Sequence, residues 1–168
     1  MTQASVVDTR FKLWLRACLA YGFNVIPPLT AKAYAQLLPG VVGVHAKRSA
    51  VLDGERVAVT LDVDEYWIPG DDPDLREDLS SQGCFIVALR WHVQAGAKTS
   101  AVGSERLDVV ERTDAVHPRV HRHPYGCPNH MREATHVRPP EQWLSFVDTV
   151  LAGALGDHLL TWDQDAED

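Results

Sequence analysis

The sequence predicts an α+β fold, an antiparallel meander of four to five strands flanked by N-terminal and C-terminal helices. Near both chain ends, apolar residues recur at three- and four-residue spacing, which is typical of helices with one buried face. Between them lie valine-rich runs of alternating polarity, and Asp53-Gly54 separates the first two as a strong hairpin signal. Because helical and strand patterns are segregated along the chain, they favour α+β over alternating α/β.

The length of 168 residues fits a single domain, residues 1–168. Along it we expect an N-terminal helical part (1–40), a sheet with a histidine-rich segment (41–138), a C-terminal helix (139–161) and an acidic tail (162–168). An apolar fraction of 45% and a charged fraction of 23% are ordinary for a globular protein.

The net charge of −7 argues against a general nucleic-acid-binding surface, because phosphate contacts need clustered lysine and arginine. Residues 112–138 are nevertheless locally basic, which is compatible with a basic catalytic patch in an acidic protein. We expect no membrane span, since no run of about 18 apolar residues occurs, and no secretory signal is seen. Cys18, Cys84 and Cys127 form no even-numbered disulfide framework, so a reducing cytoplasm is the expected compartment.

The first helix is predicted over residues 9–21, with Asp8 as its N-cap and Gly22 as its stop. Its inward-facing residues are predicted to be Phe11, Trp14, Leu15, Cys18 and Leu19. A shorter helix over 30–38 follows, closed by Pro39-Gly40.

Four strands are predicted near residues 41–52, 55–64, 84–94 and 105–113. The stretch 66–82 is rich in acids and prolines and is expected to be a solvated connection.

Pro139-Pro140 then introduces a helix over 140–156, whose apolar residues, including Trp143 and Val147, are expected to face inward.

The segment His117–His136, HPRVHRHPYGCPNHMREATH, holds five of the eight histidines and is the candidate site. Its prolines favour extended backbone at the residues that precede them. In an extended chain alternate side chains share a face, so His117, Arg119, His121 and His123 are expected to line up together.

Such a row suits acid–base cleavage of RNA, in which His121 and His123 are the leading acid and base candidates. Arg119 is predicted to hold the phosphate, Asp114 to fix a histidine tautomer, and Tyr125 to supply a further donor. Arg119, His121 and His123 are expected to line a cleft open to solvent beside the strand at 105–112.

A second interpretation is a zinc site formed by Cys127, His130 and His136 and completed by His121 or His123. The protein would then be a non-catalytic, metal-stabilised interaction protein. A third is a rigid surface loop whose histidines form local hydrogen bonds. An acidic antitoxin or regulatory subunit is a further alternative, because it fits the net charge.

Over about residues 41–155, the order of motifs resembles that of the small bacterial toxins of the TumE type, which are encoded beside an antitoxin. The motifs are the hairpin VLDGERV, the strand ending RWHV, the strand LDVVERTDAVHP, and the run HRHPYG followed by a helix. The family's arginine-then-acid turn before a proline and a histidine cluster is matched by Arg112, Asp114, Pro118, His121 and His123.

This resemblance implies a growth-inhibiting activity directed at RNA and neutralised by an antitoxin or other protein partner. The leading prediction is therefore a cytoplasmic, metal-independent endoribonuclease that needs no cofactor, with zinc confined to the alternative site. A homodimer is an alternative assembly.

Overall fold

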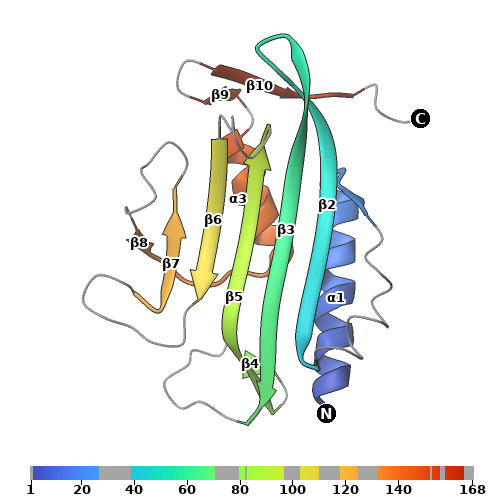
Figure 1. Cartoon of the computed structure of the whole chain (residues 1–168), viewed down its shortest axis with the longest axis vertical. Helices are drawn as coiled ribbons and strands as arrows, with labels where there is room; N and C mark the ends of the chain where they lie inside the picture. The colour runs from blue at the N-terminus through green and yellow to red at the C-terminus, as the bar shows by residue number, and fades with distance from the viewer. Residues whose placement is uncertain are drawn as a thin grey trace.

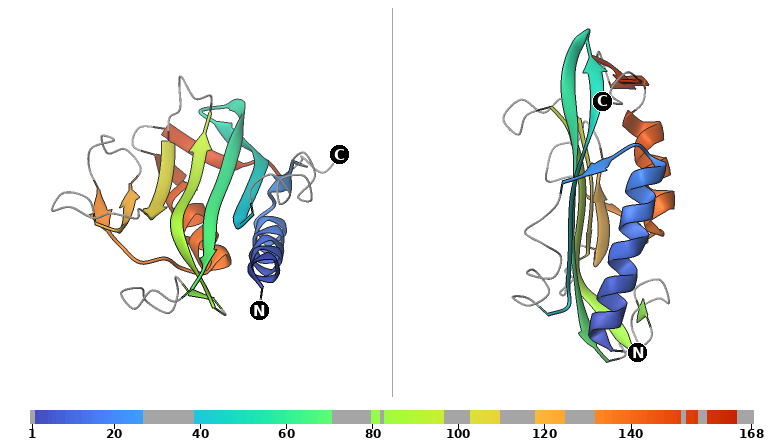
Figure 2. Two further views of the ribbon diagram at one scale, coloured as in Figure 1. Left: turned by 60° about the horizontal axis from the view of Figure 1, so that its bottom comes forward. Right: turned by 90° about the vertical axis from the view of Figure 1, so that its right-hand side faces the viewer.

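The computed structural model describes residues 2–26, 39–70, 80–81, 83–96, 103–109, 118–124, 132–151, 153–155 and 158–164. In these ranges two helices lie on one side of a single antiparallel sheet (Figures 1 and 2). The predicted α+β class and the flanking helices are confirmed, although the sheet has more strands than predicted. No helix in the described ranges has the length and apolar character needed to cross a membrane.

Helix α1, Gln3–Ala20, begins earlier than predicted because its N-cap is Thr2 and not Asp8. The Thr2 hydroxyl accepts a hydrogen bond from the backbone N–H of Ser5 at 3.3 Å. Asp8 instead lies within the helix and pairs with Lys12 one turn later, at 2.6 Å.

The end of α1 is as predicted, because Gly22 adopts a left-handed φ of 69° just after the helix. The inward face is partly different: Leu19 is 81% exposed, and Phe11 and Leu15 are only partly buried. The fully buried stripe consists of Val6, Trp14, Ala17 and Cys18. The predicted helix 30–38 lies outside the described residues.

The predicted hairpin is confirmed as strands β2, Val41–Leu52, and β3, Glu55–Pro69. Asp53 and Gly54 connect them with φ values of 52° and 86°, and two positive φ angles are what a type I′ turn requires. Strand β3 runs beyond the predicted end at residue 64 and passes through a β-bulge between Tyr66 and Trp67.

Part of the predicted connection 66–82 is therefore strand. Trp67 explains the extension, because its side chain is 2% exposed and continues the buried row of β3. Residues 71–79 and 82 lie outside the described residues.

The remaining strands of the sheet are β1 (Asn24–Val25), β4 (Ser80–Ser81), β5 (Cys84–Ala95), β6 (Gly103–Val109), β7 (Val120–His123), β8 (Glu133–Ala134), β9 (Gly153–Leu155) and β10 (His158–Trp162). Their order is β8-β7-β6-β5-β3-β2-β10-β9, with β1 on β2 and β4 on β5. From β2 to β8 the sheet is the predicted meander, with β5 near its centre (Figure 1).

Helix α3, Pro140–Leu151, is shorter than the predicted 140–156, because the chain returns to strand at Gly153. Strand β10 pairs antiparallel with β2 and buries Leu160 completely, so the C-terminal segment extends the sheet. Neither β9 nor β10 was predicted from the sequence.

The core fills the space between the sheet and the two helices. Trp14 of α1, Trp91 of β5 and Trp143 of α3 meet edge to face, with ring centroids 4.8 to 6.2 Å apart. Because successive side chains of a strand alternate between faces, most polar residues of β3, β5 and β6 and the two histidines of β7 lie on the face away from the helices.

A buried carboxylate joins α1 to the sheet on the helix side. Glu65 is 1% exposed and accepts two hydrogen bonds from Arg10, at 2.7 and 3.0 Å. The indole N–H groups of Trp14, Trp67 and Trp91 donate to the same carboxylate at 2.8 to 3.1 Å. This network satisfies a charge that would otherwise be costly to bury.

Candidate functional site

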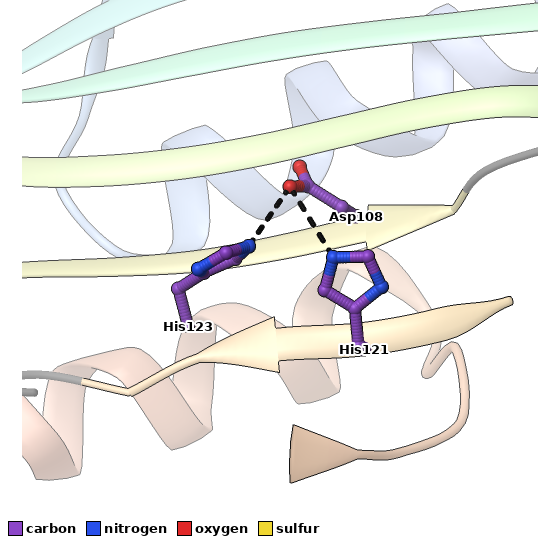
Figure 3. Close-up of side chains that lie close together, drawn as sticks. All are labelled: Asp108, His121 and His123. Atoms are coloured by element: carbon purple, nitrogen blue, oxygen red, sulfur yellow. Dashed lines mark ion pairs between the residues drawn. The ribbon is translucent and has the colours of Figure 1, made fainter. Parts of the chain in front are cut away.

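The register between β6 and β7 assembles four polar side chains on the sheet face away from the helices. Leu107 of β6 is buried in the core, so Arg106 and Asp108 on either side of it point to the opposite face. Arg106 pairs with His123 and Asp108 pairs with His121. Figure 3 shows both imidazole rings directed at the Asp108 carboxylate.

The distances within this cluster are short. Asp108 Oδ2 lies 3.3 Å from His123 Nε2 and 3.7 Å from His121 Nε2, and the ring centroids are 5.1 Å apart. The Arg106 guanidinium bridges the group, with Nη2 at 2.8 Å from His123 Nε2 and Nε in ion-pair contact with Asp108 Oδ2 at 2.9 Å. The cluster is thus one connected unit of two histidines, one carboxylate and one guanidinium.

Hydrogen bonds assign a donor or an acceptor role to one nitrogen of each ring. His121 Nδ1 lies 2.8 Å from the carbonyl oxygen of Pro118, which can only accept, so Nδ1 carries the hydrogen and Nε2 faces Asp108. Arg106 can only donate, so His123 Nε2 accepts from it and His123 Nδ1 carries the hydrogen. That Nδ1 is buried and has no hydrogen-bond partner in the described part of the chain.

Burial is the main reason that the pKa of His123 lies below its ordinary value, and the positive charge of Arg106 lowers it further. The negative charge of Asp108 opposes this shift. His123 is therefore mainly neutral at pH 7, the state in which an imidazole can accept a proton.

The two histidines of the cluster are less exposed than the open cleft expected from the sequence would make them. His121 and His123 are only 3% and 8% exposed. The Arg106 side chain is 33% exposed and is the member of the cluster that solvent reaches most easily.

The structure places two further predicted residues. Arg119 directly precedes β7, is partly buried, and interacts with other groups. His136 lines a small cavity with Leu107 and Trp143 on the helix side of the sheet. Since His121 and His123 are on the other face, the described residues do not bring His136 into one metal site with them.

The other predicted site residues lie outside the described residues. They are Asp114, His117, Tyr125, Cys127 and His130.

Arg106 and Asp108 were not predicted as site residues. The sequence does indicate that the two side chains share a face, because the stretch at 105–112 alternates as a strand and directs both of them away from the Leu107 side. What was missing was the β6–β7 register, which pairs them with the histidines.

Asp108, His121 and His123 also form a possible metal-ligand set, because their ligand atoms all lie within 4.8 Å of one another. Two imidazoles and one carboxylate suit zinc or ferrous iron. The His121 Nδ1–H held by a carbonyl is the usual orienting contact of a metal-bound histidine. Arg106 opposes this use, since its guanidinium contacts the Nε2 atom of His123 and adds a competing positive charge.

Comparison of the chain with protein-family models, with curated proteins and with solved structures gives no match.

Proposed function

We propose that the chain is a toxin-like endoribonuclease that cleaves RNA by metal-independent acid–base catalysis at Arg106, Asp108, His121 and His123. The observation that carries this proposal is the contact of two histidines with a guanidinium and a carboxylate in one cluster. These groups supply what the reaction needs: a base, an acid and a cation for the phosphate.

In the proposed reaction neutral His123 accepts the proton of a ribose 2′-hydroxyl, whose oxygen forms a bond to phosphorus. The bond from phosphorus to the 5′-oxygen breaks, and protonated His121 gives its Nε2 proton to that leaving oxygen. The products are a 2′,3′-cyclic phosphate and a free 5′-hydroxyl.

Arg106 has the role that the sequence pattern predicted for Arg119. Its guanidinium contacts His123 in the free protein, and its partial exposure makes it the first group that an incoming phosphate meets. On binding, it exchanges His123 Nε2 for phosphate oxygens, which leaves the base free to act and places a planar cation on the transition state.

A cleavage assay with mixed RNA and a metal chelator tests this mechanism. We expect His121→Gln and His123→Gln each to lower the rate about 10²- to 10⁴-fold, the usual contribution of one acid or base. Arg106→Lys should also lower it, because lysine lacks the planar fork. His136→Gln is the matched control, since His136 lies on the other side of the sheet.

Both site histidines are buried, so circular dichroism must show that each variant is folded. Folded variants that cleave RNA at the wild-type rate would contradict the mechanism, as would a wild type without cleavage.

Zinc binding is the second candidate, and the spacing of the three ligand atoms favours it. It predicts about one equivalent of zinc in untagged protein, lost in Asp108→Asn. RNA cleavage that disappears on chelation and returns with zinc would support this candidate over the metal-free mechanism.

The biological setting that we propose, a cytoplasmic toxin held inactive by an antitoxin partner, rests on the sequence resemblance. Expression of the chain alone should inhibit bacterial growth, and coexpression with the product of a neighbouring reading frame should relieve the inhibition and yield a copurifying complex. Normal growth during expression of the folded protein alone would oppose this setting.

A further inference from the structure

A second polar feature lies on the same face of the sheet as the histidine cluster. It is an open cavity of about 530 Å³ over β2, β3 and β5. Its polar lining consists of His45, Lys47, Arg56, Thr60, Asp62 and Gln94. The helices cover the other face, so this cavity, which we call the β2–β3 groove, is separate from the core (Figure 2).

Among the described residues that line the β2–β3 groove, Lys47 is the cation without an ion-pair partner. It is exposed. The groove's carboxylate, Asp62, is already engaged, with Oδ1 at 2.5 Å from His45 Nδ1. The Arg56 side chain is 75% exposed, and its Nε lies 3.2 Å from Asp163 Oδ2. The groove therefore offers positive charge in a protein whose net charge is negative.

In the described part of the chain, the other carboxylates on this face near the groove and the cluster also have cationic partners. Asp64 pairs with Arg90 at 3.1 Å, and Asp108 pairs with Arg106. They therefore repel an approaching anion less than unpaired carboxylates would.

A straight row of residues connects the groove to the histidine cluster. The strand register aligns His45, Asp62, His92, Arg106 and His123 directly opposite one another across β2, β3, β5, β6 and β7. Four strand spacings of about 4.8 Å separate the ends of this row by roughly 19 Å. An anion bound in the groove and a phosphate at Arg106 are thus within the span of one short nucleic-acid strand.

We infer that the β2–β3 groove binds the phosphate backbone of a single-stranded RNA segment next to the bond cleaved at the histidine cluster. This inference rests on the proposed function. Lys47 contacts a phosphate, and Thr60 and Gln94 add a hydroxyl and an amide that suit the base edges of an unpaired strand.

Binding can be measured without cleavage by using a fluorescent 2′-O-methyl oligonucleotide of about 12 nucleotides, which lacks the attacking hydroxyl. We expect Lys47→Gln to raise Kd about two- to tenfold, as the loss of one hydrogen bond predicts. Between about 50 and 200 mM salt, it should reduce the slope of log K against log salt by about 0.7, because one phosphate contact is removed.

Lys12→Gln is the matched control. It removes the same charge from α1, on the other side of the sheet, where Lys12 forms an exposed pair with Asp8. Kd and salt slope should stay at the wild-type values. An equal effect of both variants, or a wild type that binds no oligonucleotide, would overturn the assignment of the groove.

The cleavage assay separates this inference from the proposed function. A dinucleotide reaches only the histidine cluster, so Lys47→Gln should cleave it normally but show a raised KM for the long RNA. Binding that depends on Lys47 without any cleavage would remove the ribonuclease proposal and leave the groove. If Lys47→Gln cleaves both substrates as the wild type does, the groove assignment is overturned and the ribonuclease proposal stands.

Discussion

At the scale of single residues, Glu65 shows how a charge is kept inside this protein. Five hydrogen bonds, two from Arg10 and three from indoles, replace the water that its carboxylate loses on folding. Such a group is stable only while its partners are present, because an uncompensated buried charge is far more costly than an exposed one.

We therefore expect Arg10→Met to lower the free energy of unfolding by roughly 3–5 kcal/mol, the usual cost of breaking a buried ion pair. Lys12→Met, which breaks an exposed pair on the same helix, should cost only about 0.3–0.5 kcal/mol. Urea denaturation of both variants measures the difference. Equal small losses would show that Arg10 is not needed to hold the Glu65 carboxylate.

At the scale of elements, the start of β2 is fixed by the closeness of its backbone to β3 and α1. Gly40 has a φ of 87°, and its carbonyl oxygen accepts a hydrogen bond from the backbone N–H of Trp67. A Cβ atom at Gly40 would lie 2.3 Å from the Trp67 carbonyl oxygen and 2.5 Å from Gln3 Nε2. Because one of these atoms is backbone, a side chain there forces β2 and β3 apart.

Gly54 provides a control with nearly the same backbone angle, a φ of 86°, and a Cβ atom there would have no neighbouring atom within 4 Å. We expect Gly54→Ala to cost about 1–2 kcal/mol of stability, from left-handed strain alone. Gly40→Ala should cost about 1–3 kcal/mol more, because it adds a steric clash. Thermal unfolding of both variants tests this, and equal losses would contradict the steric argument.

Among these elements, the sequence predicts those that local patterns determine and not those that depend on long-range strand pairing. Valine alternation and Asp53-Gly54 located the β2–β3 hairpin, because both signals are local. Strand β10 was missed since its pairing with β2 joins residues about a hundred positions apart, and LLTW alone does not indicate a strand. The histidine pair was found for its local composition, whereas Arg106 and Asp108 needed a register that no local pattern contains.

At the scale of the whole molecule, histidines link stability to pH. Burial and then Arg106 lower the pKa of His92 and His123 below the ordinary 6.5. Below about pH 6.5 the unfolded chain therefore binds more protons at these sites than the folded protein does. The free energy of unfolding must then fall as the pH falls from that value towards the lowered pKa.

We expect the urea midpoint at about pH 5.5 to lie below that at about pH 7.5. The double variant His92→Gln, His123→Gln should show a smaller difference between the two pH values, because the groups that resist protonation are gone. The exposed His136→Gln serves as the control and should behave as the wild type does. A double variant with an unchanged pH dependence would mean that other groups cause it.

The segregation of aromatic residues also decides what light can report about this molecule. All five tryptophans, Trp14, Trp67, Trp91, Trp143 and Trp162, belong to the core or pack against it. Three of the indoles donate hydrogen bonds to the Glu65 carboxylate. Unfolding separates these indoles from that charge, so it changes their fluorescence emission directly. The histidine cluster and the β2–β3 groove contain no indole among their described residues. Tryptophan fluorescence therefore reports folding in this protein. Detecting a ligand on the polar face requires a fluorescent dye attached to that ligand.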